Sequence, residues 1–413
     1  MTGSPPDHTT SPLSGLRVFD MTRVLAGPTC TQILGDLGAG VIKIERPGRG
    51  DDSRGMGPPY LTDAQGKDTA ESAYFLSVNR NKRSVTLNLT TEEGQELARR
   101  MIGKCDVVVE NFRTGALAQY GLAYDQIREA YPALVYCSVT GFGQTGPYAE
   151  RGGYDYLVQG MGGIMSVTGE PGDAPTKVGV GVSDIITGMY AAIAIQAALR
   201  HRDLTGEGQH IDMALLDSQV AWLSYVGENY LVSGEMPQRL GNQHPNIMPY
   251  QVFRASDGLM VLAVGNDAQF TRFCEFAECP DLAADERYTT NAGRVKNRDG
   301  LTPVLADIIA SKSIAHWVEG LVGVNVPCSP INTIDQVFND PQVVARKMKI
   351  NMPHPHLSGE TMDLIASPLR LSRSPVSYRQ APPQLGEHTA EVLEELLEMD
   401  EKKMAALREK GVI

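Results

Sequence analysis

The 413-residue sequence lacks several patterns by which classes of protein are recognised. Its six cysteines include no C-x-x-C pair, and its eight histidines form no ligand cluster with them. This scatter predicts reduced thiols in a cytosolic protein and no structural metal. No stretch approaches about 18 consecutive apolar residues, which argues against a membrane span, and no apolar segment near the N-terminus indicates a secretion signal.

Concentrated positive charge is also missing. The formal net charge is −12 and no basic block is present, which argues against nucleic acid as a main partner. A local group of arginines and lysines can still bind a small anion. The first predicted βα turn, Leu25-Ala26-Gly27-Pro28, has no G-x-G-x-x-G fingerprint, so a nicotinamide or flavin dinucleotide is not predicted. A phosphate-bearing or backbone-held ligand at this turn is left open.

The first half of the chain shows a doubly wound α/β pattern. Short apolar runs alternate with helical stretches, which predicts a parallel sheet with right-handed crossovers. The predicted strands are 15–20, 41–45, 85–89, 106–110, 134–139 and 210–213. With 42% hydrophobic and 21% charged residues, the chain has the composition of a globular protein large enough for two or three domains.

The pattern changes along the chain in a way that suggests domain boundaries. Residues 1–12 are polar and rich in Pro, Ser and Thr, and are predicted to be a disordered tail. Residues 13–225 form the first part of a large Rossmann-like domain. Residues 226–325, with a strand pair around Ser256-Asp257-Gly258, form a smaller α+β domain. Residues 326–413 return to the large domain and end in amphipathic helices.

Charged side chains follow several of the predicted strands. Arg46 ends the second strand, and Asn111-Phe112-Arg113 follows the fourth. At the carboxyl end of a parallel strand such residues face the crevice where open α/β sheets bind ligands, although for Arg46 a solvated charge in a loop fits this stretch equally well. The stretch Asn79–Ser84 is a compact basic group just before the third strand. Its cations suit phosphate groups, but they suit a solvated loop equally well.

Asp184 combines two features that point in different directions. It lies with Ser183 at the start of a predicted long helix, where both residues fit an N-cap. The flanking Gly179, Gly181 and Gly188 also let a ligand come close. A carboxylate in this setting is suited to be a reachable nucleophile, and we expect the helix dipole to keep it ionised.

Six stretches, taken in this order, resemble the class III CoA-transferases, the family of formyl-CoA transferase and carnitine CoA-transferase. They are Asp20–Pro28, Asp36–Glu45, Asn79–Ser84, Val109–Phe112, Thr205–Gln209 and Gly386–Thr389. The resemblance runs from about Leu13 to the C-terminus. It implies a Rossmann-like large domain with a small inserted domain, and a cytoplasmic homodimer whose two subunits interlock like links of a chain.

The resemblance also implies roles for individual residues. The family nucleophile falls on Asp184, and the acid beside the thioester falls on Asp155, which follows Tyr154. Coenzyme A contacts fall on Leu25, Ala26, Arg46, Lys82, Arg83, Asn111, Phe112, Arg113 and Arg151.

Two departures from the family pattern limit these assignments. Gln119 stands where formyl-CoA transferase has an arginine near CoA, so Arg113, Arg151 or Arg83 would have to supply that charge. The glycine run of the formyl-CoA transferase lid is absent, and 241–246 occupies that region. Formyl or oxalyl substrates are therefore not implied.

The implied reaction moves CoA from an acyl-CoA donor, such as succinyl-CoA, to a carboxylic acid through aspartyl anhydride and aspartyl-CoA thioester intermediates. It needs no metal and no tightly bound cofactor. An α-methylacyl-CoA racemase is an alternative, but there a histidine precedes the acid that matches Asp155, and Tyr154 is a poor replacement for it. A non-catalytic CoA-binding protein is a third interpretation, which the intact Asp184 disfavours. The identity of the two acids is open.

Overall fold

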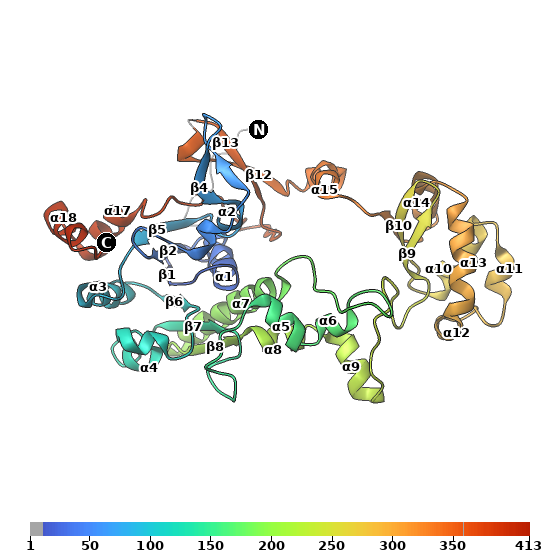
Figure 1. Ribbon diagram of the computed structural model, residues 1–413, viewed down its shortest axis with the longest axis horizontal. Coiled ribbons are helices and arrows are strands. Elements are labelled where there is room, and N and C mark those ends of the chain that lie inside the picture. Colours follow the sequence, from blue (N-terminus) through green and yellow to red (C-terminus); the bar gives the residue numbers. More distant parts are fainter. Residues whose placement is uncertain (1–10, 358) are drawn as a thin grey trace. The chain divides into compact units, whose positions relative to one another are not determined.

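The computed structural model describes residues 11–357 and 359–413 (Figure 1). The chain divides into two compact units. The larger contains the described residues up to Ile164, Lys177–Leu231 and Val344–Ile413, and the smaller contains Met165–Thr176 and Val232–Val343. The predicted tail, residues 1–12, lies outside the described residues except for its last two positions.

The larger unit is built on a six-stranded parallel sheet with the strand order β5-β2-β1-β6-β7-β8. Its strands are β1 (Arg17–Asp20), β2 (Gly40–Glu45), β5 (Lys82–Thr86), β6 (Val107–Glu110), β7 (Val135–Thr140) and β8 (His210–Ala214). Every residue of β6 and β7 is buried, as expected for parallel strands covered on both faces. The mixed α/β fold with a parallel sheet, predicted from sequence, is confirmed.

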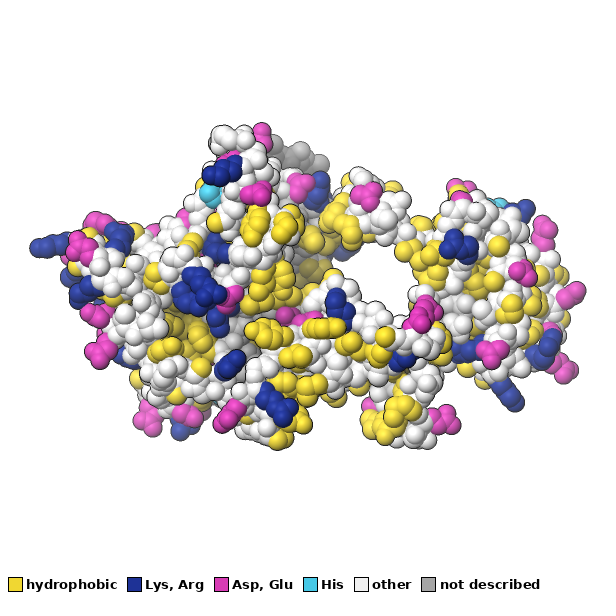
Figure 2. All heavy atoms as spheres, viewed as in Figure 1, with side chains coloured by type: hydrophobic (Ala, Val, Ile, Leu, Met, Phe, Trp, Pro, Cys, Tyr) yellow, Lys and Arg dark blue, Asp and Glu magenta, His cyan; other side chains and the backbone are white. Residues whose placement is uncertain are grey.

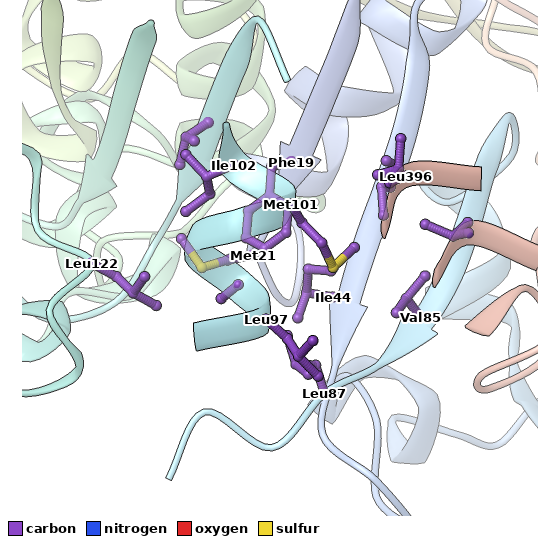
Figure 3. Close-up of a cluster of buried hydrophobic side chains, with 14 of the residues drawn as sticks. Phe19, Met21, Ile44, Val85, Leu87, Leu97, Met101, Ile102, Leu122 and Leu396 are labelled. Atoms are coloured by element: carbon purple, nitrogen blue, oxygen red, sulfur yellow. The ribbon is translucent and has the colours of Figure 1, made fainter. Parts of the chain in front are cut away.

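Helices cover both faces of this sheet. One hydrophobic core joins α1 and α7 to the sheet, and another, shown in part in Figure 3, joins α3 and the C-terminal helices to the opposite face. In that second core, Leu97 and Met101 of α3 and Leu396 of α17 point toward strand residues such as Phe19 and Val85. The helices of this unit are α1 (Ala26–Asp36), α2 (Ala73–Ser77), α3 (Glu92–Ile102), α4 (Tyr124–Ile127), α5 (Asp155–Met161), α7 (Val182–Thr205), α8 (Leu215–Ala221), α17 (Thr389–Leu397) and α18 (Glu401–Glu409).

Short elements complete the larger unit. They are the 3-10 helices η2 (Asp52–Gly55), η3 (Ala116–Tyr120) and η4 (Pro355–Leu357) and the hairpin pairs β3 (Tyr60–Thr62) with β4 (Asp68–Ser72) and β12 (Lys349–Pro353) with β13 (Thr361–Ile365). The segment Gly386–Thr389 joins α17 to the edge of the sheet. The Gly386 N–H donates to Ser84 Oγ at 2.9 Å, and Thr389 Oγ1 accepts the Thr86 N–H at 3.0 Å.

Helix α7 is long and apolar enough, by length and composition alone, to cross a membrane. In the structure, more than half of its most apolar part is buried, and the helix packs on α1 and on β7 and β8. A core helix passes the same test, so the apolar composition of α7 is explained by the face that it buries.

The smaller unit has its own hydrophobic core around the three-stranded antiparallel sheet β11-β10-β9. The predicted strand pair around Asp257 is present as β9 (Tyr250–Ala255) and β10 (Gly258–Ala263). Strand β11 (Cys328–Pro330) pairs with β10, so the chain is still in the smaller unit beyond residue 326, where the sequence suggested a return. Its helices are α10 (Asp267–Phe276), α11 (Pro280–Ala284), α12 (Asn291–Lys296), α13 (Arg298–Ala310), α14 (Ile314–Gly323) and α15 (Ile334–Asn339). Three further helices lie where the chain passes from one unit to the other: α6 (Ile164–Val167), α9 (Ser224–Ser233) and α16 (Pro341–Ala345).

Candidate active site

A cavity opens in the larger unit at the carboxyl ends of β1, β6 and β7. In the sheet, β2 lies on one side of β1 and β6 lies on the other, so the strand order reverses at β1. Open α/β sheets bind ligands at such a reversal. The cavity is lined by residues 23–26, Asp52, 111–114, 139–141, 151–154, Asp184 and Leu215. It therefore brings together most of the residues predicted from sequence, namely Leu25, Ala26, Asn111, Phe112, Arg113, Arg151, Tyr154 and Asp184.

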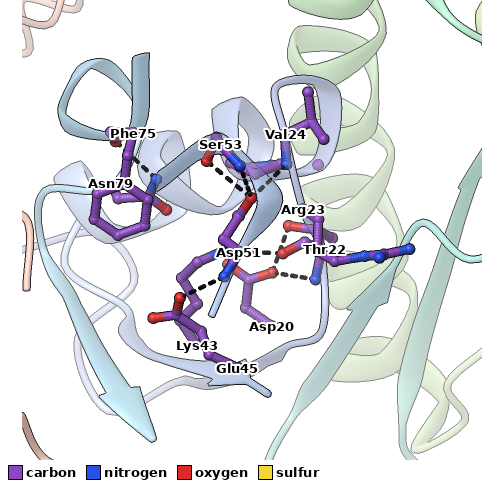
Figure 4. Close-up of polar contacts among 12 residues, drawn as sticks. Asp20, Thr22, Arg23, Val24, Lys43, Glu45, Asp51, Ser53, Phe75 and Asn79 are labelled. Carbon is purple, nitrogen blue, oxygen red and sulfur yellow. Dashed lines mark hydrogen bonds and ion pairs between the residues drawn. The ribbon is translucent and has the colours of Figure 1, made fainter. Parts of the chain in front are cut away.

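A buried ion pair holds the first wall of this cavity (Figure 4). Lys43 and Asp51 have fully buried side chains, and Lys43 Nζ lies 2.7 Å from Asp51 Oδ2 and 2.9 Å from the Thr22 carbonyl oxygen. Asp51 Oδ1 accepts the Val24 N–H at 3.1 Å. Burial alone would raise the pKa of Asp51, but Lys43 and these hydrogen bonds hold it well below its usual range. The pair fixes the turn that presents Leu25 at the start of α1, where Val24 has a φ of 71°.

Asn111 belongs to the scaffold of the second wall. Its side-chain amide accepts the Arg23 N–H at 2.9 Å and donates to the Arg23 carbonyl oxygen at 2.7 Å. The Arg23 guanidinium lies 5.1 Å from the centre of the Phe112 ring. Because both hydrogen-bonding ends of the Asn111 amide are used, this residue locks the end of β1 to the end of β6.

Asp184 faces the cavity from the first turn of α7. The helix begins at Val182 with Gly181 at the N-cap position, so neither Ser183 nor Asp184 is the cap that the sequence suggested. The capping acceptor comes instead from Asp155, whose Oδ1 accepts the N–H groups of Ser183 at 2.8 Å and of Asp184 at 3.4 Å. The two carboxylates are neighbours because one caps the helix that carries the other.

Two of the flanking glycines are required by close approach. A Cβ at Gly181 would lie 2.8 Å from Leu25 Cδ2, and one at Gly188 would lie 2.5 Å from the Ala26 carbonyl oxygen. Glycine at these positions therefore lets α7 contact the Leu25–Ala26 turn directly, which places Asp184 in the same cavity as that turn.

The electrostatic setting of Asp184 differs from the expectation that the helix dipole keeps it ionised. Burial, together with the nearby Asp155 carboxylate, raises the pKa of Asp184 to about 7. Without a ligand, Asp184 is thus only partly ionised at neutral pH. Desolvation and like charge outweigh the favourable helix terminus at this position.

Asp155 is itself held by a buried glutamine. Gln159 Nε2 donates to Asp155 Oδ2 at 2.7 Å, and Gln159 Oε1 accepts the Val178 N–H at 2.9 Å. Gln159 is fully buried. Tyr154, the residue before Asp155, has 70% of its surface exposed and lies at the edge of the cavity.

Two predicted coenzyme A contacts lie elsewhere. Lys82 is fully buried, donates to the Pro28 carbonyl oxygen at 3.0 Å and lies 3.3 Å from Asp20 Oδ2; burial lowers its pKa to about 8. Arg83 points to α17, where it pairs with Glu391 and Glu395. The basic group of 79–84 therefore holds the larger unit together, and neither residue reaches the cavity.

Arg46 lies in an adjoining cavity, which shares Arg23 and Phe112 with the first. Its lining residues are Met21, Arg23, 44–46, Gly50, Asp51, 87–90, Phe112 and Tyr120. Arg46 Nη2 lies 2.7 Å from Asp52 Oδ1. The two cavities thus adjoin at the carboxyl ends of the strands, with Asp184 in the first cavity and Arg46 in the second.

Sequence reasoning missed several residues that line the first cavity, among them Arg23, Asp52, Thr114, Thr140 and Leu215. Arg23 had a usable signal, because it follows the end of β1 just as Asn111 follows the end of β6. Asp52 had none, since it lies in a loop whose path only the structure shows.

Residues 13–389 match the model of the family described as CoA-transferase family III. The chain therefore belongs to this family, and it is a class III CoA-transferase. It is 48% identical over 385 residues to the succinate–glutarate CoA-transferase of Agrobacterium fabrum, covering 93% of this chain and 96% of that protein.

Two further comparisons agree. The chain is 41% identical over 405 residues to the human succinyl-CoA:glutarate CoA-transferase, covering 97% of this chain and 90% of the human protein. A solved structure of a CAIB/BAIF family protein from Brucella suis matches with a TM-score of 0.82 and 48% identity, covering 94% of this chain and all of that one.

Proposed function

We propose that this enzyme transfers CoA between small dicarboxylic acids, with succinyl-CoA as donor and a five-carbon dicarboxylate such as glutarate as acceptor. The choice of acids follows the names of the two relatives above. Binding of an anionic acyl-CoA, whichever acids are used, is supported by Arg113 and Arg151, which line the cavity with Asp184 and form no ion pair with any residue in the described part of the chain; the Arg151 guanidinium lies 3.9 Å from the centre of the Tyr148 ring. Guanidinium groups without an ion-pair partner, in the same cavity as the reacting carboxylate, suit anionic substrates.

Asp184 is the proposed nucleophile. Its carboxylate attacks the carbonyl carbon of succinyl-CoA, the C–S bond breaks, and CoA leaves as a thiolate from a mixed anhydride. The thiolate then attacks the aspartyl carbonyl of the anhydride. This releases succinate and leaves Asp184 as a CoA thioester.

The second half of the reaction reverses these steps with the acceptor. The acceptor carboxylate attacks the aspartyl thioester and expels the thiolate, which gives a second anhydride. The thiolate attacks the acceptor-derived carbonyl, and the new acyl-CoA leaves while the Asp184 carboxylate is restored. The reaction consumes no proton and no water molecule. Because water would hydrolyse the mixed anhydride, the site has to exclude water while the anhydride is present.

The observation that carries this mechanism is the position of Asp184 in the cavity on the first turn of α7, next to Asp155. The Asp155 carboxylate is held by Gln159 and by two backbone N–H groups, so its orientation relative to Asp184 is fixed. We propose that Leu25, Ala26 and Arg46, together with the Asn111–Arg113 loop and Arg151, contact the CoA portion.

A transfer assay tests the proposal. Purified enzyme, succinyl-CoA and a panel of carboxylic acids are mixed, and the new acyl-CoA is measured by liquid chromatography. We expect dicarboxylates of four and five carbons to be the best acceptors and Asp184→Asn to form no product. Comparable rates with simple monocarboxylic acids would contradict the proposed substrate class.

We also propose that the enzyme works in the cytoplasm as an interlocked homodimer with an inserted small domain. Support comes from apolar side chains that α5, α7, α8 and α9 leave exposed, among them Leu157, Ile193, Val220 and Leu231. Figure 2 shows exposed hydrophobic side chains gathered over the larger unit. Exposed apolar surface of this kind is typical of an interface. Sedimentation at nanomolar concentration measures the assembly, and a stable monomer would contradict the dimer.

A further inference from the structure

Three arginines converge on one carboxylate where the two cavities meet. Asp52 Oδ1 lies 2.7 Å from Arg46 Nη2 and 3.1 Å from Arg49 Nη2, and Asp52 Oδ2 lies 3.1 Å from Arg23 Nη1. Arg23 follows β1, whereas Arg46 follows the neighbouring β2. The sheet therefore brings guanidinium groups from two strand ends to the same place.

This group carries more positive charge than its surroundings balance. Three guanidinium groups face one carboxylate, and the buried neighbours Lys43 and Asp51 neutralise each other. The donors are also not all used. Arg23 Nε is buried and has no hydrogen-bond partner within residues 11–357 and 359–413. A buried donor without an acceptor is unfavourable, and a ligand oxygen would relieve it.

Starting from the contact between Arg46 and CoA proposed above, we infer that Arg23 joins Arg46 in binding a phosphate group of CoA and that Asp52 is a counter-ion which this phosphate displaces from both arginines. The inference rests on the proposed use of CoA thioesters. A phosphate oxygen and the Asp52 carboxylate compete for the same guanidinium N–H groups, and the two anions repel each other. Asp52 lines the cavity itself, so a bound phosphate would meet its charge directly. Asp52 thus lowers the affinity for CoA and favours its release.

The inference predicts that removing an acid strengthens binding. Binding of free CoA to the full-length enzyme is measured by isothermal titration calorimetry, which requires no turnover. Asp52→Asn keeps one oxygen that can accept a hydrogen bond but removes the charge, and we expect it to bind CoA about threefold to tenfold more tightly. Arg23→Gln should bind CoA more weakly than the wild type. Asp68→Asn removes one negative charge at an exposed position of β4, outside both cavities, and should leave affinity unchanged.

Each result decides a separate point. Unchanged or weaker binding by Asp52→Asn, in a variant that unfolds at the wild-type temperature, would overturn the inference and show that Asp52 positions the arginines. If the wild type bound no CoA, both the proposed function and this inference would fail. Repeating the titration with dephospho-CoA, which lacks the 3′-phosphate, identifies the group: tightening that persists assigns the diphosphate, and tightening that disappears assigns the 3′-phosphate.

Discussion

Replacing Asp184 by asparagine should destroy activity and yet stabilise the protein at alkaline pH. The pKa of Asp184 is raised from its ordinary value of 3.8 to about 7 by burial and by Asp155. A raised carboxyl pKa means that the folded protein binds the proton more tightly than the unfolded chain. Stability therefore falls as pH rises from about 4 to about 7, and the full cost of ionising Asp184 is present above about pH 7. Asparagine has no such cost.

The magnitude follows from the shift. The full shift from 3.8 to about 7 would correspond to about 4 kcal/mol, but Asp184 is only half-buried and its cavity admits water, so we expect about 1–2 kcal/mol. Loss of the favourable contact between a negative charge and the helix N-terminus offsets part of this gain. At pH 8 the variant should then unfold a few degrees above the wild type.

Thermal unfolding of the two proteins, followed by circular dichroism at pH 8 and at pH 5, tests this reasoning. The difference in unfolding temperature should be largest at pH 8 and should shrink by more than half at pH 5, where the wild-type Asp184 is protonated in the folded state. Transfer activity of the variant should fall by more than about a thousandfold. A variant that is less stable than the wild type at pH 8 would refute the raised pKa, whatever its activity.

Three further predictions concern other residues. Arg46→Ala should raise KM for the acyl-CoA while kcat changes little, and a collapse of kcat at constant KM would contradict a binding role. The wild-type kcat/KM should rise with pH up to about 7, and Asp155→Asn should move this limb to lower pH because it removes the like charge beside Asp184; an unmoved limb would contradict the coupling. Lys82→Met should destabilise the protein by about 3–5 kcal/mol because it leaves Asp20 buried without its partner. In the fraction that folds, KM for acyl-CoA should be unchanged; a raised KM would show that Lys82 contacts CoA after all.

The sheet could be predicted because its signal is local. Apolar runs such as Val107–Val109 are typical of strands buried on both faces, and the strand-end rule then placed Asn111 and Arg46 at one edge. Asp184 could be singled out because its signal is also local: glycines flank it along the chain, and they are needed where α7 packs closely against the start of α1.

The failures of prediction all depend on tertiary partners. Nothing in the sequence of the basic stretch shows that Lys82 faces Asp20 or that Arg83 faces α17, because both partners are distant along the chain. The same holds for the cap of α7. Its acceptor is Asp155, which lies nearly thirty residues earlier, so a local capping rule assigned the role to the wrong residues. The raised pKa of Asp184 also follows from that contact and from burial, neither of which a sequence pattern displays.

The covalent attachment of CoA to Asp184 is the central claim, and mass spectrometry tests it most directly. Enzyme incubated with succinyl-CoA alone is quenched, treated with hydroxylamine and digested, and the peptide that contains residue 184 is sequenced by fragmentation. We predict an aspartyl hydroxamate at Asp184 in the wild type and none in Asp184→Ala, which should still bind CoA. A hydroxamate at Asp155, or transfer activity in Asp184→Ala, would contradict the account.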